Sequence, residues 1–189
     1  MESSKGKFIV QILGNNLDAW KKDKMHLQFA LLDYLRKIKF PYKTPSPIRN
    51  IFGETLFYLF GEHLWVYRYI EGEVKKEIGK EEFLEISRAV ATFHKLTKRF
   101  HEKDKGDYNN LAWQKEKYDL VKNAPVKNDL DKLMHENILL MQYYLDKLAL
   151  LNYGKYQVVH SDFNIGNVLF KKGKIIGILD FDNVIFASR

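Results

Sequence analysis

The stretch "VVHSDFNIGNVLFKKGKIIGILDFD", residues 158–182, decides the fold. It holds two runs rich in β-branched residues, and "HSDFNIGN" places Asp162 and Asn167 five residues apart, with Gly166 permitting a tight loop. The turn "KKGK" separates "NVLF" from "KIIGILDF", so the sequence predicts a β-hairpin. Pairing those strands would bring the loop that contains Asp162 and Asn167 close to Asp180, which ends the second run.

These three polar side chains suit a phosphate-transfer site. Mg²⁺ takes oxygen ligands and often uses few from the protein, so one Asn and one Asp of this set could hold it. A separate Asp could then orient an attacking hydroxyl and accept its proton. Each residue alone is also typical of a turn, where Asp and Asn side chains bond to nearby backbone. The whole set, His-x-Asp-x₄-Asn, a hairpin and then apolar-Asp-Phe, favours the catalytic interpretation.

The bulk composition is typical of a soluble globular protein. The chain has 189 residues, of which 46% are hydrophobic and 29% are charged, enough for one or two domains with a buried core. No apolar run approaches the roughly 20 residues that cross a bilayer, and "MESSKGKFIV" shows no signal peptide. The absence of cysteine excludes disulfides and thiolate metal sites. We therefore expect a cytoplasmic protein without a membrane partner.

The charge balance is basic, since 31 Lys and Arg against 24 Asp and Glu give a net charge of +7. Such a balance permits nucleic-acid, anionic-membrane or nucleotide partners. The lysines are mixed with acids, as in "VKKEIGKEE" and "HEKDKGD", which is typical of solvated surfaces. We therefore expect no nucleic-acid partner; the alternative, a basic nucleic-acid binder, predicts steeply salt-dependent binding.

The first part of the chain is predicted to be rich in strands. "KFIVQIL", residues 7–13, is typical of a short strand. Helical spacing of leucines predicts an amphipathic helix over residues 17–38, which three prolines then end. "ETLFYLFGEHLWVYRYIEG", residues 54–72, predicts two strands around a turn at Gly61 and Glu62.

The second part is predicted to be mainly helical. Apolar spacing indicates a helix over residues 81–100, beginning with Phe83, then a polar loop with a short helix that ends by Pro125. A second stripe, from Leu130 to Leu151, indicates another helix, capped by Asn128 or Asp129. Short strands at "YQVVH", "NVLF" and "KIIGILDF" follow. We therefore expect a strand-rich lobe over residues 1–70, a helix-rich lobe over residues 71–189, and a ligand cleft between them.

The segment from His160 to Asp182 resembles the catalytic segment of the aminoglycoside phosphotransferase and choline kinase superfamily, which shares its core with protein kinases. The family pattern is His-Gly-Asp-x₄-Asn, followed by Ile-Asp-Phe-(Asp/Glu). This chain has "HSDFNIGN" and "LDFD" at those places, so Ser161 stands where glycine is usual. This serine is a mild departure that should leave the chemistry unchanged. The resemblance implies an α+β, two-lobed protein-kinase-like fold.

The resemblance also implies an activity and roles for individual residues. The γ-phosphate of ATP or GTP would pass to a hydroxyl of a small molecule, with Mg²⁺ as cofactor. Asp162 would be the catalytic aspartate, and His160 would brace its loop. Asn167 and Asp180 would be the Mg²⁺ ligands. The expected partners are a nucleotide and a small-molecule acceptor.

Two other stretches carry the resemblance further. "AVATFHKL", residues 89–96, is similar to the family's Ala-x-x-Leu-His helix, in which we assign His94 no catalytic role. "WVYRYIEG", residues 65–72, is similar to the last strand of the small lobe and the hinge, whose backbone grips adenine. Tyr69 and Ile70 are the expected hinge contacts, although a well-packed aromatic strand would have the same pattern.

The nucleotide-binding positions depart from the family pattern. Family members carry a Lys or Arg for the phosphates on the strand where this chain has Gln11, and a Glu that pairs with it where this chain has Gln28. A Gln–Gln pair can form a hydrogen bond and leaves no buried charge without a partner. A neutral amide stabilises a phosphate less than a cation does, so we expect weaker nucleotide binding or turnover.

The resemblance covers nearly the whole chain but only the middle of the family fold. Family members begin with two further strands around a phosphate-covering loop and continue with helices that shape the acceptor pocket. We therefore expect a fold truncated at both ends, from a fragment, a truncated gene product or a reduced relative. The leading hypothesis is a small-molecule kinase; the alternative is a catalytically weak pseudokinase that serves as a nucleotide-binding or interaction module. The acceptor (aminoglycoside, choline, homoserine or sugar) and the oligomeric state stay open.

Overall fold

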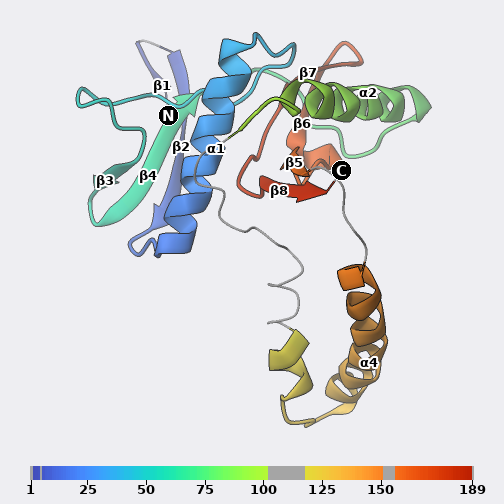
Figure 1. The fold of residues 1–189 in the computed structure, drawn as a ribbon. Helices are drawn as coiled ribbons and strands as arrows, with labels where there is room; N and C mark the ends of the chain where they lie inside the picture. The colour runs from blue at the N-terminus through green and yellow to red at the C-terminus, as the bar shows by residue number, and fades with distance from the viewer. Residues whose placement is uncertain (1, 5, 102–117, 151–155, 189) are drawn as a thin grey trace. The chain divides into compact units, whose positions relative to one another are not determined.

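The computed structural model describes residues 2–4, 6–101, 118–150 and 156–188 (Figure 1). The chain forms two compact units: residues 1–106 with 157–185, and residues 107–156 with 186–189. All the candidate site residues belong to the first unit. The lobe boundary expected near residue 70 falls inside that unit, and the division into two lobes stays a prediction.

A four-stranded antiparallel sheet opens the first unit, in the order β1-β2-β4-β3. Its strands are β1 (Glu2–Ser3), β2 (Gly6–Gly14), β3 (Phe57–Leu59) and β4 (Glu62–Arg68). The β3–β4 turn lies at Phe60 and Gly61, one residue before the predicted Gly61–Glu62, because Glu62 already pairs with Leu59 as part of β4. Gln11 is paired with the buried Trp65 across β2 and β4. The predicted strands are confirmed, whereas β1 was too short to predict.

Helix α1 (Ala19–Lys37) lies against this sheet (Figure 1). The helix begins where Asp18 accepts a 2.7 Å hydrogen bond from the backbone N–H of Lys21, which satisfies one of the free donors of the first turn. Leucines at helical spacing are buried along one face, and Phe29 on this helix packs edge-on against Trp65 at 5.3 Å between ring centroids. The predicted amphipathic helix is confirmed.

The hairpin that the sequence predicts is present. It joins β6 (Val168–Lys171) to β7 (Lys174–Ile178), with Val168 opposite Ile178. The turn residues Lys172 and Gly173 both have positive φ, 52° and 76°, as a two-residue type I′ turn requires. The hairpin therefore has the register that places the ends of both strands side by side.

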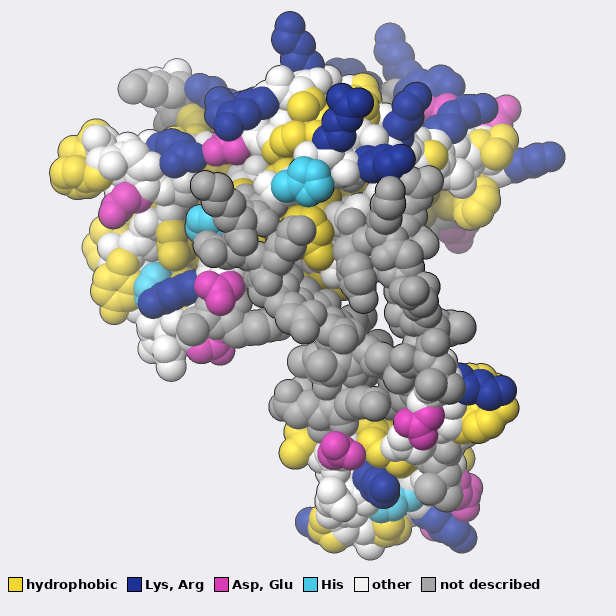
Figure 2. Space-filling model, viewed as in Figure 1, with side chains coloured by type: hydrophobic (Ala, Val, Ile, Leu, Met, Phe, Trp, Pro, Cys, Tyr) yellow, Lys and Arg dark blue, Asp and Glu magenta, His cyan; other side chains and the backbone are white. Residues whose placement is uncertain are grey.

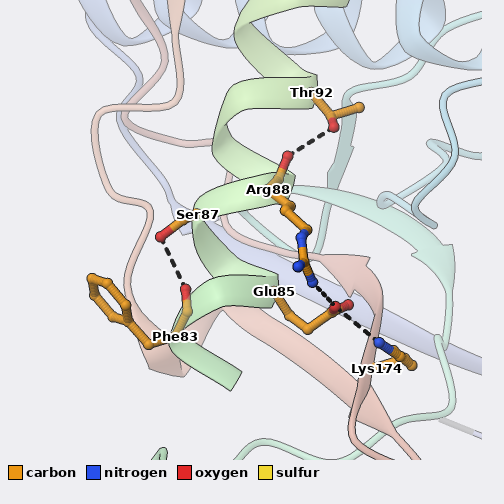
Figure 3. Close-up of polar contacts among 6 residues, drawn as sticks. All are labelled: Phe83, Glu85, Ser87, Arg88, Thr92 and Lys174. Carbon is orange, nitrogen blue, oxygen red and sulfur yellow. Dashed lines mark hydrogen bonds and ion pairs between the residues drawn. The ribbon is translucent and has the colours of Figure 1, made fainter. Parts of the chain in front are cut away.

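Helix α2 (Lys80–Thr97) packs on this hairpin. Figure 3 shows the polar contact: Glu85 accepts hydrogen bonds from Arg88 at 2.8 Å and from Lys174 of β7 at 3.0 Å. The hydrogen bonds from Lys174 and Arg88 hold the pKa of Glu85 below its ordinary value. Phe93 is fully buried, but Phe83 is 60% exposed, so the predicted apolar stripe begins one turn later than expected.

The segment after β4 is tied to the hairpin by backbone. Glu73 and Phe170 exchange both backbone hydrogen bonds, at 2.9 and 2.8 Å. Gly72 lies so close to β6 that a Cβ built there would be 2.8 Å from Cβ of Leu169 and 3.1 Å from Cδ1 of Ile176. The absence of a side chain at residue 72 therefore lets the two backbone segments meet.

We expect Gly72→Ala to lower the free energy of unfolding by about 1–3 kcal/mol, because the new methyl group forces a shift in a packed region. Urea denaturation followed by circular dichroism measures the change. Glu71→Ala is the matched control, since Glu71 is 83% exposed and makes only a 3.9 Å ion pair with Lys171. Equal stability of both variants would contradict the close packing at residue 72.

The second unit contains helix α4 (Asp129–Leu150) and a helical turn at residues 118–122. The carboxamide of Asn128 accepts from the backbone N–H of Asp131 at 2.9 Å, which selects Asn128 among the two expected caps. Ile138 is buried with Tyr118, whereas several members of the predicted stripe are exposed: Leu130, Leu133, Leu140 and Tyr144. The stripe's expected end, Leu151, lies outside the described residues.

Two further short strands are β5 (Tyr156–Val159), which was predicted, and β8 (Ile185–Ser188), which was not. None of the helices in the described segments combines the length and apolarity that crossing a membrane requires. Figure 2 shows lysine and arginine side chains along one edge of the first unit, with acidic side chains among them.

Candidate active site

The loop after β5 is shaped by an asparagine. Asn164 precedes a single 3-10 turn (Ile165–Asn167), and its Oδ1 accepts from the backbone N–H of Gly166 at 2.8 Å. A Cβ at Gly166 would lie 3.1 Å from that oxygen, so glycine gives the loop its room. This capped turn leads directly into β6 and holds Asp162 and Asn167 close together in space.

The carboxylate of Asp162 is held by two amides. Asn164 Nδ2 donates to Oδ1 at 2.6 Å, and Asn167 Nδ2 donates to Oδ2 at 3.0 Å and to the backbone oxygen of Asp162 at 2.9 Å. Each carboxylate oxygen keeps lone pairs that can accept a further hydrogen bond. The loop thus presents a fixed, partly accessible acceptor. No role was predicted for Asn164 from the sequence; the signal that could have found it is its place two residues before Gly166, since Asn side chains in turns commonly bond to nearby backbone.

The structure brings Asn167 and Asp180 to the same edge of the hairpin. The backbone N–H of Leu179 donates to the backbone oxygen of Asn167 at 2.8 Å, which continues the β6–β7 pairing up to the residue before Asp180. The expected meeting of the loop with the end of β7 is confirmed. Asp180 is exposed and has a φ of 57°, a conformation that is uncommon for residues other than glycine and marks the end of the strand.

The oxygen atoms at this edge fit Mg²⁺. Because Asn167 Nδ2 is engaged by Asp162, Oδ1 of its carboxamide is the atom available to a cation. Within the described residues, no hydrogen bond reaches the Asp180 carboxylate, and no group of three or more His, Cys, Asp or Glu side chains could hold a metal ion. Two oxygen ligands suit Mg²⁺, which keeps several waters and binds substrate phosphates.

His160 is a buried structural residue. It is 2% exposed, its Nε2 donates to the backbone oxygen of Leu179 at 3.0 Å, and its ring packs against Phe181 at 4.7 Å between centroids. Burial lowers the pKa of His160, and the hydrogen bond to Leu179 and the charges of nearby aspartates oppose this shift. The ring is therefore neutral near pH 7 and connects the loop to the end of β7.

Since its pKa is lowered on folding, the neutral His160 stabilises the fold above the ordinary pKa of about 6.5, and that stability is lost as the pH falls below this value. We expect the free energy of unfolding to fall more steeply in the wild type than in His160→Gln between pH 7.5 and 5.5. The excess slope is at most about 1.4 kcal/mol per pH unit. Urea unfolding at both pH values measures it, and parallel slopes would contradict a buried neutral imidazole.

Ser161 has a φ of 64°, in the left-handed region that favours glycine. The family pattern has glycine at this position, so the backbone explains that preference. We expect Ser161→Gly to raise the free energy of unfolding by about 0.5–1 kcal/mol, the left-handed strain of about 1–2 kcal/mol less the greater unfolded-state entropy of glycine. Thermal unfolding measures the gain; Ser87→Gly, on the exposed side of α2, should destabilise instead.

A cavity of about 290 Å³ lies beside these groups. Its lining comprises Gln11, Gln28, Pro45, Trp65, Tyr67, Asn167 and residues 179–182. The sheet, helix α1 and the segment at the end of the β6–β7 hairpin therefore line one space. The cavity brings together four of the predicted site residues, Gln11, Gln28, Asn167 and Asp180.

Gln11 and Gln28 do not form the expected pair with each other. Both donate to Asp182: Gln11 Nε2 to Oδ2 at 2.8 Å and Gln28 Nε2 to Oδ1 at 3.0 Å. Burial and then the negative charge of Asp180 raise the pKa of Asp182, while the two amide hydrogen bonds oppose the rise. The two amides therefore satisfy a half-buried carboxylate. This role was not predicted from the sequence, where Asp182 was noted only as the second acid of the "LDFD" motif.

The hinge residues lie elsewhere. Tyr69 and Ile70 follow β4 and line a separate cavity of about 370 Å³, which the C-terminal turns of α1 also line. The structure therefore does not bring these two residues to the cavity that Gln11 lines. Tyr67, two residues earlier, does line that cavity, and burial followed by the charges of Asp182 and Asp180 raises its pKa. Adenine contact by Tyr69 and Ile70 stays a prediction.

A small antiparallel sheet with one helix, joined to a helix and a catalytic-type hairpin, defines an α+β fold of the protein-kinase-like class. The phosphotransferase enzyme family model matches residues 2–187. The chain therefore belongs to the phosphotransferase enzyme family. No curated protein matches it.

Solved structures of this class match nearly the whole chain. Amicoumacin kinase hAmiN, in complex with AMP-PNP, Ca²⁺ and Ami, is 21% identical with a TM-score of 0.67, over 98% of this chain and 55% of that one. The gentamicin complex of APH(2")-IIa is 19% identical with a TM-score of 0.62, over 96% and 60%. The GDP complex of aminoglycoside 2'-phosphotransferase-IIIa is 13% identical with a TM-score of 0.60, over 95% and 68%. The chain thus spans a little over half the length of the first two.

Proposed function

We propose that this chain carries the catalytic centre of a Mg²⁺-dependent phosphotransferase that moves the γ-phosphate of ATP or GTP to a hydroxyl of a small molecule. The observation that carries the proposal is the fixed geometry of Asp162, Asn167 and Asp180 around the loop and hairpin. Similar proteins were solved with AMP-PNP, ADP or GDP, and with gentamicin or streptomycin, which supports this substrate class.

Asp162 is the proposed catalytic residue. Its carboxylate, oriented by Asn164 and Asn167, accepts a hydrogen bond from the acceptor hydroxyl and takes the proton as that oxygen attacks phosphorus. Neutral His160 does not compete for the proton, because its basic atom, Nδ1, is buried while Nε2 donates to Leu179. It acts as a positioning residue for the loop.

Asn167 and Asp180 are the proposed Mg²⁺ ligands. When bound, Mg²⁺ neutralises phosphate charge and so favours in-line transfer. The chain's own contribution is the hairpin pairing, which sets the distance between the two ligands and keeps both on the side of the cavity. Gln11 and Gln28 border the same cavity and are proposed to contact the nucleotide.

The second candidate function is a catalytically weak pseudokinase that serves as a nucleotide-binding module. It is favoured by one specific observation: the positions that carry Lys and Glu in the family hold glutamines, and both donate to Asp182. An amide engaged with a carboxylate offers a phosphate less stabilisation than a cation would.

A panel of nucleotides separates the two candidates. Thermal unfolding is measured with ATP, GTP or neither, each with Mg²⁺ or EDTA, and phosphate transfer is followed with γ-labelled nucleotide and a panel of aminoglycosides, choline, homoserine and sugars. Mg²⁺-dependent stabilisation with transfer supports the kinase. Stabilisation without transfer to any acceptor supports the pseudokinase. No stabilisation by either nucleotide would contradict both.

A further inference from the structure

The cavity beside Asp180 lacks a cation in its lining. Nucleotide phosphates carry several negative charges, and phosphate sites normally place a Lys or Arg on them in addition to the metal. Among the described residues that line this cavity, none is Lys or Arg, while Asp180 and Asp182 both contribute negative charge. A nucleotide bound at Gln11 therefore needs a positive group from just outside the lining.

Lys24 is the lysine whose position on α1 suits it to neutralise nucleotide phosphates in this cavity. It lies on α1 four residues before Gln28, so the two side chains share one face of the helix, one turn apart. Gln28 donates to Asp182, and the charge of Lys24 also acts on Asp182. Lys24 is half-buried, and burial lowers its pKa while the charge of Asp182 opposes the shift.

The cation and the helix carboxylate of the kinase-type cluster are the two charges that differ in this chain. The family pattern has a strand cation, a helix carboxylate and the two acids of the Asp-Phe-(Asp/Glu) element; this chain keeps both acids as Asp180 and Asp182, has Gln28 for the helix carboxylate, and carries a helix cation at Lys24. Gln11 and Gln28 satisfy both oxygens of Asp182, so that carboxylate keeps its hydrogen bonds when Lys24 turns to another anion. The flexible four-carbon stem of a lysine permits that turn.

We propose that Lys24 is the residue that neutralises the nucleotide phosphates in this chain, in place of the strand residue at position 11. The inference rests on the proposed function, because it needs a nucleotide in the Gln11 cavity. It predicts that this family member takes its phosphate cation from the helix beside the sheet, close enough to Asp182 for the two charges to act on each other.

The test is calorimetric titration of the full chain with Mg²⁺ and whichever of ATP or GTP stabilises the wild type, and with the matching nucleoside. Lys24→Gln should weaken nucleotide affinity about tenfold or more, the usual loss for a hydrogen bond to a charged group, and leave nucleoside affinity within about twofold. Lys24→Arg should keep most of the affinity. Lys22→Gln makes the same chemical change at an exposed position of the same helix and is the matched control.

A rescue variant gives a second line of evidence. Gln11→Lys in the Lys24→Gln background returns the cation to the strand and should restore nucleotide affinity to within about threefold of the wild type. Should Lys24→Gln unfold, the Gln11→Lys variant still tests the inference, because a second cation beside a working Lys24 should add less than threefold.

The outcomes separate this inference from the proposed function. Equal nucleotide affinity in the Lys24→Gln and Lys22→Gln variants overturns the role of Lys24 while the proposed function stands. Lower thermal stability of Lys24→Gln with unchanged affinity also overturns it, since Lys24 would then serve the fold and not the nucleotide. A wild type that binds neither nucleotide overturns the proposed function, and the inference with it.

Discussion

Asp162→Asn should reduce phosphate transfer by about 10²–10⁴-fold, the usual contribution of a positioned general base, while the protein stays folded. Asparagine keeps the shape of the side chain but cannot accept the proton of the attacking hydroxyl. One of the two amide donors, Asn164 or Asn167, would also meet an NH₂ group in place of an oxygen. Transfer of labelled phosphate at saturating nucleotide measures the loss in kcat.

Asp18→Asn is the matched control for this variant. It makes the same chemical change at the N-cap of α1, where asparagine caps as well as aspartate, so activity and stability should both be retained. Mg²⁺-nucleotide should stabilise Asp162→Asn about as much as the wild type, because this residue acts on the acceptor. Equal transfer by Asp162→Asn and the wild type would remove Asp162 from the mechanism and leave the pseudokinase as the better candidate.

The part of the site that could be predicted from the sequence is the part formed by residues close to one another in the chain. The turn at Lys172 and Gly173 fixes the hairpin register, and that register determines which residues lie beside Asn167. The loop around Asp162 is likewise closed by hydrogen bonds between residues two to five apart. Local spacing was therefore sufficient to predict that Asp162 contacts Asn167 and that their loop lies beside the end of β7, next to Asp180.

The partners of Gln11 and Gln28 could not be predicted in the same way. Their hydrogen bonds to Asp182 join residues 171 and 154 positions apart, so only the packing of the sheet and α1 over the hairpin creates them. The sequence offered a plausible Gln–Gln pair, but the carboxylate is the stronger acceptor and takes both amides. Short elements such as β1 escaped prediction because two residues carry no periodic signal.

Asp180→Asn should produce two effects of opposite sign. Loss of a metal ligand should reduce phosphate transfer by at least about a hundredfold, since metal charge contributes several kcal/mol to such transition states. The Mg²⁺-dependent part of the stabilisation by nucleotide should disappear with it. Asparagine is the appropriate replacement because, unlike most residues, it tolerates the left-handed φ of 57°.

The second effect concerns the protein without ligands. The charge of Asp180 helps to raise the pKa of the half-buried Asp182, so the ionised Asp182 lowers stability at every pH above its ordinary pKa of about 3.8. Asp180→Asn removes that repulsion and should leave the melting temperature in EDTA at neutral pH equal to or above that of the wild type. Asp18→Asn should show neither effect. A variant that loses stability in EDTA while it keeps its Mg²⁺-dependent shift would show that Asp180 supports the fold and does not bind the metal.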